Sequence, residues 1–374
     1  MAEDNTEQQR TIAATTVKEI QTAIFNWYDL HGRKTLPWQH NRTCYRVWLS
    51  EVMLQQTTVK TVIPYFERFT ECFPTVKQLA EAHIDQVLHL WSGLGYYSRA
   101  RNMHKAAQMV MNEFGGDFPE QINDLQRLPG VGRSTAGAIM ALGRGTRAAI
   151  LDGNVKRLLC RLYAVAGWSG RAAVSKQLWQ LAELHTPATR LPDWTQAVMD
   201  MGATLCTRTR PACERCPVQP WCQAWARQAQ NLYPQPRPRK ETPLRQTRML
   251  MCVNGDHEVL LQKRPARGIW GGLWSFPELS VESELHTALG EQLNIDITCH
   301  EVWPRFRHTF SHYELDIEPV RLTVEARDLA LGSENESIWL PLSPCHAEPG
   351  IGAGKAIGLA APVQKLLAQL CTTL

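Results

Sequence analysis

The sequence predicts a multidomain protein in which an all-α domain is followed by an α+β domain. Up to about residue 231, apolar residues recur at every third or fourth position, as they do in amphipathic helices. From residue 248 onwards, most apolar runs are short and alternate with polar residues, as they do in strands. Between these parts, residues 232–247 contain prolines at positions 234, 236, 238 and 243, which indicates an extended linker.

The individual elements follow from the same periodicities. Helical periodicity is clearest in residues 50–57, 61–69, 76–82, 85–91, 100–114 and 177–185. Strands are expected at 248–253, 258–264, 273–279 and within 308–326, and helices at 283–293 and 361–370. Asn254-Gly255 is typical of a hairpin turn between the first two strands. The predicted domains are therefore 17–231 and 248–374, joined by the linker 232–247.

Composition excludes a membrane span and favours a reducing compartment. Among the 374 residues, 44% are hydrophobic, yet no apolar run approaches the ~20 residues that a membrane helix needs. The first 16 residues are polar and lack the apolar stretch of a signal peptide. The 11 cysteines are odd in number, and most are scattered, which favours free thiols over disulfides. We expect a monomeric cytoplasmic protein that has no contact with a membrane.

Four cysteines stand apart from the rest because they lie close together, at Cys206, Cys213, Cys216 and Cys222. Clustered thiolates bind zinc or an iron–sulfur cluster. Zinc sites usually show two C-x2-C pairs or histidines, whereas this segment has one such pair and no histidine nearby. The spacing favours a four-iron cluster, but it differs from the ferredoxin spacings, so zinc stays open. Basic residues around the loop favour contact with phosphate; a solvated face is the alternative.

A glycine turn and an acid follow each other in the second half of the predicted helical domain. The segment Leu128–Gly132 places Gly130 and Gly132 between two helical patterns, so that the next helix offers free N–H groups to a DNA phosphate. An ordinary helix–helix turn is the alternative. Asp152 lies about one helix later, in a position typical of an N-cap. A capping carboxylate at the mouth of a cleft can also face a ligand.

Glu51 is the second candidate acid. It lies in a mostly apolar helical segment, where burial disfavours the charged carboxylate and should raise its pKa. Such a carboxyl group can donate a proton near neutral pH. The alternative is a surface glutamate on an amphipathic helix. Gln55 and Gln56, at the end of the same segment, carry paired donors and acceptors that can read base edges.

At this point the sequence resembles the adenine DNA glycosylases of the MutY type, within the helix-hairpin-helix (endonuclease III) superfamily. The resemblance extends from about Ile24 to Leu370. It rests on LPWQ, VWLSEVMLQQT, GLGYYSRARN, LPGVGRSTAGAI, ILDGNVKR, the four-cysteine loop, WGGLWSFP and FRHTFSH. It implies a helix-hairpin-helix glycosylase domain, a 4Fe–4S cluster in the loop 206–222, and a C-terminal domain similar to Nudix hydrolases. It also implies hydrolytic removal of adenine that is mispaired with 8-oxoguanine or guanine in double-stranded DNA.

The resemblance also implies roles for single residues. Glu51 would be the general acid and Asp152 the anion that stabilises an oxocarbenium-like sugar, with the adenine flipped out of the duplex. Residues implied to support catalysis or to contact the substrate are Asn154, Tyr96, Ser134, Trp38, Gln39, Gln55, Gln56, Gln196, Phe310, Ser311 and His312. The last three would sense 8-oxoguanine. The DNA phosphate contacts would be at Gly130 and Gly132.

Two other functions remain open. Bifunctional glycosylases of the endonuclease III type carry a lysine where this chain has Ser134, and cut the strand through a Schiff base. The serine favours hydrolysis alone, although Lys156 could react adventitiously with an abasic aldehyde. A non-catalytic iron–sulfur DNA-binding protein is the other alternative. The predicted helix 283–293 lacks the paired acids of Nudix hydrolases, so the second domain should bind and not cleave. The expected location is the nucleoid of a bacterium or the nucleus of a eukaryote.

Overall fold

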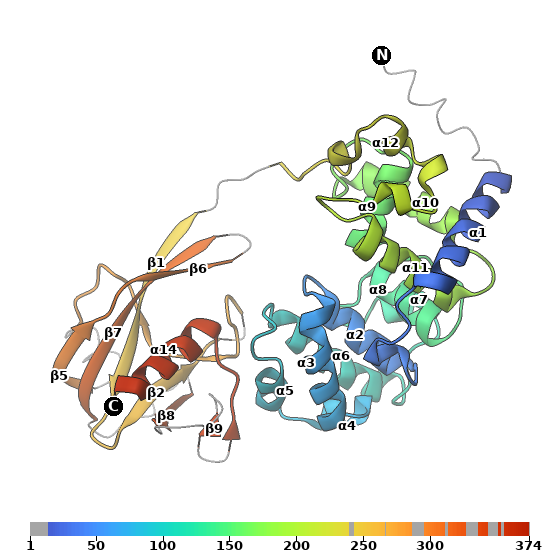
Figure 1. Cartoon of the computed structure of the whole chain (residues 1–374). Coiled ribbons are helices and arrows are strands. Elements are labelled where there is room, and N and C mark those ends of the chain that lie inside the picture. Colours follow the sequence, from blue (N-terminus) through green and yellow to red (C-terminus); the bar gives the residue numbers. More distant parts are fainter. Residues whose placement is uncertain are drawn as a thin grey trace. The chain divides into compact units, whose positions relative to one another are not determined.

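The structure is a computed structural model that describes residues 14–238, 243–265, 267–285, 295–310, 313–326, 336–342, 351–352 and 355–373. Its contacts divide the chain into two compact units. The first comprises the chain up to Ala80 together with Lys105–Pro238, and the second comprises Glu81–His104 together with the chain beyond Pro238. Figure 1 shows the helices and strands of both. No helix among the described residues is long and apolar enough to cross a membrane.

The chain up to Pro238 is helical, as predicted. Its helices are α1 (Ala14–His31), α2 (Cys44–Leu54), α3 (Val59–Cys72), α4 (Val76–Glu81), α5 (Ile84–Leu90), α6 (Ser98–Glu113), α7 (Ile122–Leu125), α8 (Arg133–Ala138), α9 (Gly153–Leu162), α10 (Ala172–His185), α11 (Leu191–Asp200) and α12 (Gln223–Ala226). Short 3-10 turns are η2 (Pro37–Gln39), η5 (Cys213–Arg215), η6 (Gln219–Trp221) and η7 (Gln230–Leu232), and π-helical turns are η3 (Ile139–Gly143) and η4 (Met201–Leu205).

Local sequence explains how several of these helices begin and pack. Thr43 and Thr58 cap α2 and α3 by accepting N–H groups three residues ahead. In α3 the buried side chains Val62, Phe66 and Phe69 recur at helical spacing. Gly137 in α8 is required by a close approach, because a Cβ there would lie 2.2 Å from the carbonyl oxygen of Ala149. This approach places α8 directly against the segment that leads to Asp152.

The second unit contains a mixed β-sheet. The strands are β1 (Leu244–Val253), β2 (Glu258–Lys263), β3 (Trp274–Ser275), β4 (Glu278–Leu279), β5 (Ile295–Val302), β6 (Phe306–Thr309), β7 (Glu314–Ala326) and β8 (Ser337–Pro341). Among the described residues they form the order β3-β2-β1-β7-β5, with β4 on β1, β6 on β7 and β8 on β2. β1 and β7 are parallel over their whole paired length, from Leu244 opposite Glu314 to Val253 opposite Thr323. A separate pair joins β9 (Ile351–Gly352) to β10 (Lys355–Ala356), and α14 (Ala361–Thr373) ends the chain.

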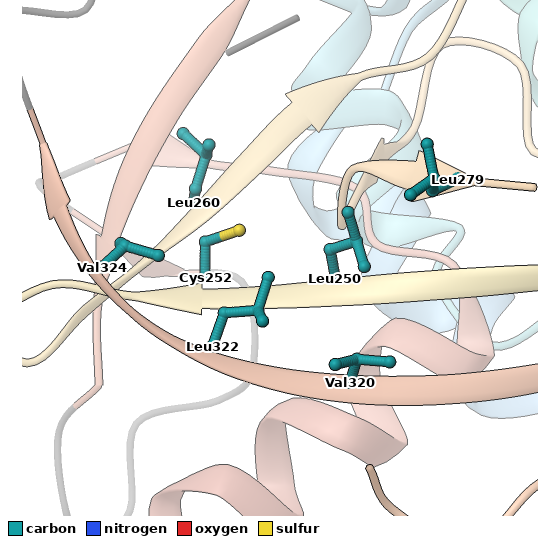
Figure 2. Close-up of a cluster of buried hydrophobic side chains, with 7 residues drawn as sticks. All are labelled: Leu250, Cys252, Leu260, Leu279, Val320, Leu322 and Val324. Atoms are coloured by element: carbon teal, nitrogen blue, oxygen red, sulfur yellow. The ribbon is translucent and has the colours of Figure 1, made fainter. Parts of the chain in front are cut away.

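The core of the sheet is built from the central strands. Figure 2 shows Leu250, Cys252, Leu260, Leu279, Val320, Leu322 and Val324, which are all buried. β1 and β7 contribute five of these side chains, and residues two apart in a strand point to the same face. Burying these side chains removes apolar area from water, which stabilises the sheet.

Most predicted elements of the second domain agree with the structure. The Asn254–His257 turn joins β1 and β2 as an antiparallel hairpin. The residues predicted as one strand over 273–279 form two short strands, and those over 308–326 form β6 and β7. β1 begins at Leu244, inside the stretch predicted as an irregular linker, because its first residues pair with β7. The predicted helix 283–293 lies largely outside the described residues.

Candidate active site and thiol loop

Asp152 has the N-cap position that its sequence context predicts. It precedes α9, and its Oδ1 accepts the N–H of Val155 at 2.8 Å. Its Oδ2 accepts the side-chain amide of Asn154 at 3.2 Å. Burial raises the pKa of this carboxyl, while the hydrogen bonds from Val155 and Asn154 act in the opposite direction by stabilising the anion. Asp152 therefore caps the helix and is held in one orientation.

Glu51 interacts electrostatically with Asp152. It lies on α2, three residues before the end of that helix, and its side chain retains partial access to solvent. Burial, and then the negative charge of Asp152, raise the pKa of Glu51 to about 8. When two carboxyl groups interact in this way, their pKa values move apart. One group then holds a proton while the other is an anion. This is the behaviour expected from the apolar segment around Glu51.

Arg157 connects the Asp152 segment to the cysteine loop. Its guanidinium donates to Oδ1 of Asn154 at 2.8 Å, to the carbonyl of Gly202 at 2.6 Å and to the carbonyl of Cys206 at 2.6 Å. Gly202 is needed here, because a Cβ on it would lie 2.5 Å from the Cβ of Asn154. Sequence reasoning missed Arg157. Its spacing of four residues from Arg161, on the helix that starts at Asp152, is the signal that could have revealed it.

Ser134 contacts the backbone next to Asp152. Its Oγ accepts the N–H of Leu151 at 2.9 Å, and Leu151 immediately precedes the capping aspartate. Ser134 lies in the first turn of α8, the helix whose Gly137 packs against the same segment. The Ser134 hydroxyl therefore fixes the position of the backbone that immediately precedes Asp152. Lys156, on α9, donates its backbone N–H to the carbonyl of Asp152 at 2.9 Å.

The four predicted metal ligands line one cavity. Cys206 follows η4, Cys213 begins η5, Cys216 follows η5, and Cys222 caps α12. The rest of the lining is mostly apolar and includes Leu158, Leu162, Leu205 and Trp225. No group of three or more His, Cys, Asp or Glu side chains is placed to hold a metal ion within the part of the chain that the structure describes. The thiols thus surround a common space without converging on one point.

Hydrogen-bond donors surround the four thiols. Arg161 donates to Sγ of Cys206 at 3.4 Å and also binds the carbonyls of Thr207 and Arg208, which follow it. Gln230 donates to Sγ of Cys213 at 3.8 Å. Burial raises the pKa of the Cys216 and Cys222 thiols, and hydrogen bonds from backbone N–H groups offset this only in part. Hydrogen bonds to sulfur are a recurrent feature of iron–sulfur sites, so this donor set fits such a cluster.

The three residues expected to line an adenine pocket also have structural contacts. Trp38 is buried and packs edge-to-face on Phe66, with ring centroids 5.5 Å apart. Gln39 bonds to its own turn, accepting the N–H of Leu36 and donating to the carbonyl of Arg33. Gln196 is buried on α11 and donates to Asp200. The segment that carries Trp38 and Gln39 lies against α2, the helix of Glu51, because Arg46 donates to the carbonyl of Pro37 at 3.0 Å.

The predicted duplex-contacting residues lie in turns. Gln55 forms the C-cap of α2, and Gln56 follows it with a positive φ of 59° and an exposed side chain. Gly130 has a φ of 80°, which favours glycine, and Gly132 is the N-cap of α8. α8 continues directly into the π-helical turn η3. The positive φ that the glycine pattern predicts is thus found at Gly130, whereas Gly132 has an extended backbone that other residues also adopt.

The remaining predicted residues belong to the second unit. Tyr96 is 45% exposed, has a φ of 49°, and is covered by the guanidinium of Arg99. Phe310 stacks on Tyr313 at 4.7 Å and also contacts Trp270 and His308. Ser311 and His312 lie outside the described residues, so their predicted contacts are not part of this structure.

Comparison with known proteins assigns two stretches of the chain to families. Residues 49–184 match the HhH-GPD superfamily of base excision DNA repair proteins, and residues 248–369 match the NUDIX domain. The chain is 39% identical to the adenine DNA glycosylase of Buchnera aphidicola subsp. Acyrthosiphon pisum, over 92% of this chain and 95% of that one. It is 33% identical to the human adenine DNA glycosylase, over 88% of this chain and 71% of that one. A thermostable thymine-DNA glycosylase of known structure aligns with a TM-score of 0.52 and 26% identity, over 57% of this chain and all of that one.

The helical part of the chain therefore belongs to the HhH-GPD superfamily of base excision DNA repair proteins. Within that superfamily, the chain belongs to the adenine DNA glycosylase family.

Proposed function

We propose that this protein hydrolyses the N-glycosidic bond of adenine in double-stranded DNA, where the adenine is mispaired with 8-oxoguanine or guanine. The observation that carries the proposal is the coupling of Glu51 to Asp152, with a Glu51 pKa of about 8. Kinship with proteins named adenine DNA glycosylase supports adenine as the base and DNA as the partner.

The proposed mechanism uses one proton and one negative charge. Adenine is a poor leaving group, and protonation of its N7 makes it a better one. Glu51 holds a proton at neutral pH and is the proposed donor. Asp152, oriented by Val155 and Asn154, is the proposed anion beside the sugar as it becomes oxocarbenium-like. The adenine has to leave the base stack for this. Gln55 is proposed to fill the gap that the adenine leaves in the duplex, Gln56 to contact the substrate and Tyr96 to support catalysis.

We propose hydrolysis without strand cleavage. Ser134 occupies the position of the lysine that forms a Schiff base in bifunctional relatives, and a hydroxyl cannot form one. Its contact with Leu151 supports a positioning role instead. The bifunctional alternative would require another amine, for which Lys156 is the nearest candidate in sequence to Asp152.

We propose that Cys206, Cys213, Cys216 and Cys222 hold a 4Fe–4S cluster. Such a cluster would fix the loop 206–222 and need not take part in the chemistry. The common cavity and the donors to sulfur support this assignment. Arg208, Arg210 and Arg215 are exposed on the loop and would then be held in place to contact phosphates, together with the backbone at Gly130 and Gly132.

We further propose a division of labour between residues 17–231, which would carry the chemistry, and residues 248–374, which would sense the base opposite adenine. Ser311 can donate and accept a hydrogen bond, which suits the N7–H and C8 carbonyl of 8-oxoguanine, while Phe310 and His312 would add contacts. The linker 232–247 would join the two. This second part would bind without hydrolysing nucleotides, because its sequence lacks the paired acids of Nudix enzymes.

The test is a base-release assay on duplexes that carry adenine opposite 8-oxoguanine, guanine or thymine. The proposal is supported if adenine is released while the DNA strand stays intact and the strand is cut only after alkali is added. Strand cleavage under mild quenching and a borohydride-trapped complex would favour the bifunctional alternative. Tight binding without any base release would favour the non-catalytic alternative.

A further inference from the structure

The first unit contains a buried carboxylate for which the proposed chemistry has no use. Asp200, the last residue of α11, is 0% exposed. The backbone N–H of Arg33 donates to its Oδ2 at 2.7 Å, and Nε of Arg33 donates to its Oδ1 at 2.8 Å. Gln196 Nε2 donates to the same Oδ1 at 2.8 Å. Asp200 is therefore an ion-pair partner of Arg33 and the acceptor for the Gln196 amide.

This contact determines the orientation of the Gln196 amide. A carboxylate in an ion pair offers acceptors only, so it must face the NH2 end of the amide. The carbonyl oxygen, Oε1, then lies on the opposite side. None of the residues that the structure describes donates a hydrogen bond to this oxygen. Gln39 differs, because its own turn uses both ends of its amide. Of the two candidate pocket amides, Gln196 is the one with an available polar atom.

Asp200 also holds the surrounding segment together. Through Arg33 it attaches the stretch 33–39 to α11. The same stretch carries Trp38 and Gln39 and contacts α2, the helix of Glu51, through the Arg46–Pro37 hydrogen bond. The residues expected to line the base pocket thus share one anchor, which preorganises them.

We propose that Asp200 is a positioning residue for base selection, because it makes Gln196 present a hydrogen-bond acceptor to the 6-position of the bound purine. Adenine carries an amino donor there, whereas guanine and hypoxanthine carry a carbonyl oxygen. An acceptor fixed in this place binds the adenine amino group and opposes a 6-carbonyl, since two acceptors would face each other without a proton between them. The inference rests on the proposed excision of adenine.

Its first test uses the wild-type protein and three substrates. Single-turnover release is measured from duplexes carrying adenine, unsubstituted purine or hypoxanthine opposite 8-oxoguanine, and each rate is divided by the acid-catalysed depurination rate of the same nucleoside. The normalised release rate should be highest for adenine, lower for unsubstituted purine and lowest for hypoxanthine, with a difference of about 10- to 100-fold between adenine and hypoxanthine. Hypoxanthine released as fast as adenine would overturn the inference. Absence of any adenine release would instead contradict the proposed function.

The second test changes Asp200. In Asp200→Asn the new amide can donate as well as accept, so the side-chain amide of Gln196 can adopt the flipped orientation. The ratio of the normalised release rate of adenine to that of hypoxanthine should then fall about tenfold. Asp200→Glu keeps a carboxylate and should retain more of the ratio. Arg33→Lys is the matched control, because it weakens the side-chain ion pair but keeps the backbone N–H that binds Oδ2 and leaves the carboxylate facing Gln196. The melting temperature and the excision rates of both substrates should fall, while the ratio of the two rates holds.

A folded Asp200→Asn protein with the full wild-type ratio would overturn the assignment. Equal loss of the ratio in Arg33→Lys and Asp200→Asn would also overturn it, since the ion pair and not the amide orientation would then be responsible. If Asp200→Asn does not fold, the substrate order of the wild type and the Asp200→Glu ratio still decide the question.

Discussion

Arg157 donates a 2.6 Å hydrogen bond to the carbonyl oxygen of Cys206, the first of the four clustered cysteines. The same guanidinium donates to Asn154, whose amide in turn donates to Asp152. A single side chain therefore connects the thiol loop to the carboxylate proposed to stabilise the sugar. Rigid support of this kind matters because small displacements of catalytic groups cost large factors in rate.

Arg157→Lys should lower adenine excision by about 10- to 100-fold, because an ammonium group cannot replace the forked contacts with Asn154, Gly202 and Cys206. Single-turnover excision and iron content should be measured on the same preparation. Arg171→Lys is the control, since Arg171 is exposed and precedes α10. Normal excision by Arg157→Lys with a full complement of iron would show that this connection is dispensable.

Ser134→Ala should destabilise the protein by about 1–3 kcal/mol and slow excision, because the N–H of Leu151 loses its acceptor. Ser134→Thr keeps the hydroxyl and should recover part of both losses. Ser134→Lys should show a new strand-cleaving activity that borohydride traps, together with slower excision. Thermal melting and product gels with and without alkali measure these effects. An alanine variant with wild-type stability and rate would argue against the positioning role.

Metal analysis tests the thiol loop. Protein purified without oxygen should contain about four iron and four labile sulfide per chain. Cys216→Ser should lose the metal and weaken duplex binding, because Arg208, Arg210 and Arg215 would no longer be held in place. Cys72→Ser is the matched control, since Cys72 is exposed on α3 outside the loop. Stoichiometric zinc with no iron would contradict the cluster assignment.

Replacing both Ser311 and His312 with alanine should narrow the preference for 8-oxoguanine:A over G:A. Each lost polar contact is worth about 1–3 kcal/mol of discrimination. The effect should appear mainly in competitive binding, and less in the rate of excision once substrate is bound, because Glu51 and Asp152 belong to the first unit. A double variant that keeps the full wild-type preference would place lesion sensing elsewhere.

Sequence reasoning predicted the features that depend on local pattern. Helical periodicity and the hairpin turn at Asn254-Gly255 report local preferences, and the structure confirms the helices and the hairpin. The prolines of the predicted linker 232–247 did not reveal that β1 begins at Leu244. The N-cap role of Asp152 is likewise visible from three residues of context. The short strands β8, β9 and β10 were missed because their patterns are too brief to distinguish from loops.

The supporting contacts could not be predicted in the same way. Arg33 and Asp200 are separated by 167 residues, and the bond from Ser134 to Leu151 depends on how closely α8 packs. Aspartate usually occurs on surfaces, so the burial of Asp200 against a partly exposed Arg33 follows only from tertiary structure. The raised pKa of Glu51 was predictable only in part. The apolar segment around Glu51 predicts the direction of the shift, but the contribution of Asp152 can be known only from the folded structure, which brings the two residues together.

The central claim is that Glu51 donates a proton to adenine while Asp152 is an anion, and the pH dependence of single-turnover adenine release tests it most directly. A carboxyl group with a pKa of about 8 is protonated below that pH, so the rate should be sustained at neutral pH. Above pH 8 the proton is lost, and the rate should fall about tenfold per pH unit. Glu51→Gln should bind the duplex but release adenine about 10²- to 10⁴-fold more slowly at neutral pH, without this alkaline decline. Near-normal release by Glu51→Gln, or a wild-type rate that stays flat well above pH 8 on intact duplex, would contradict the claim.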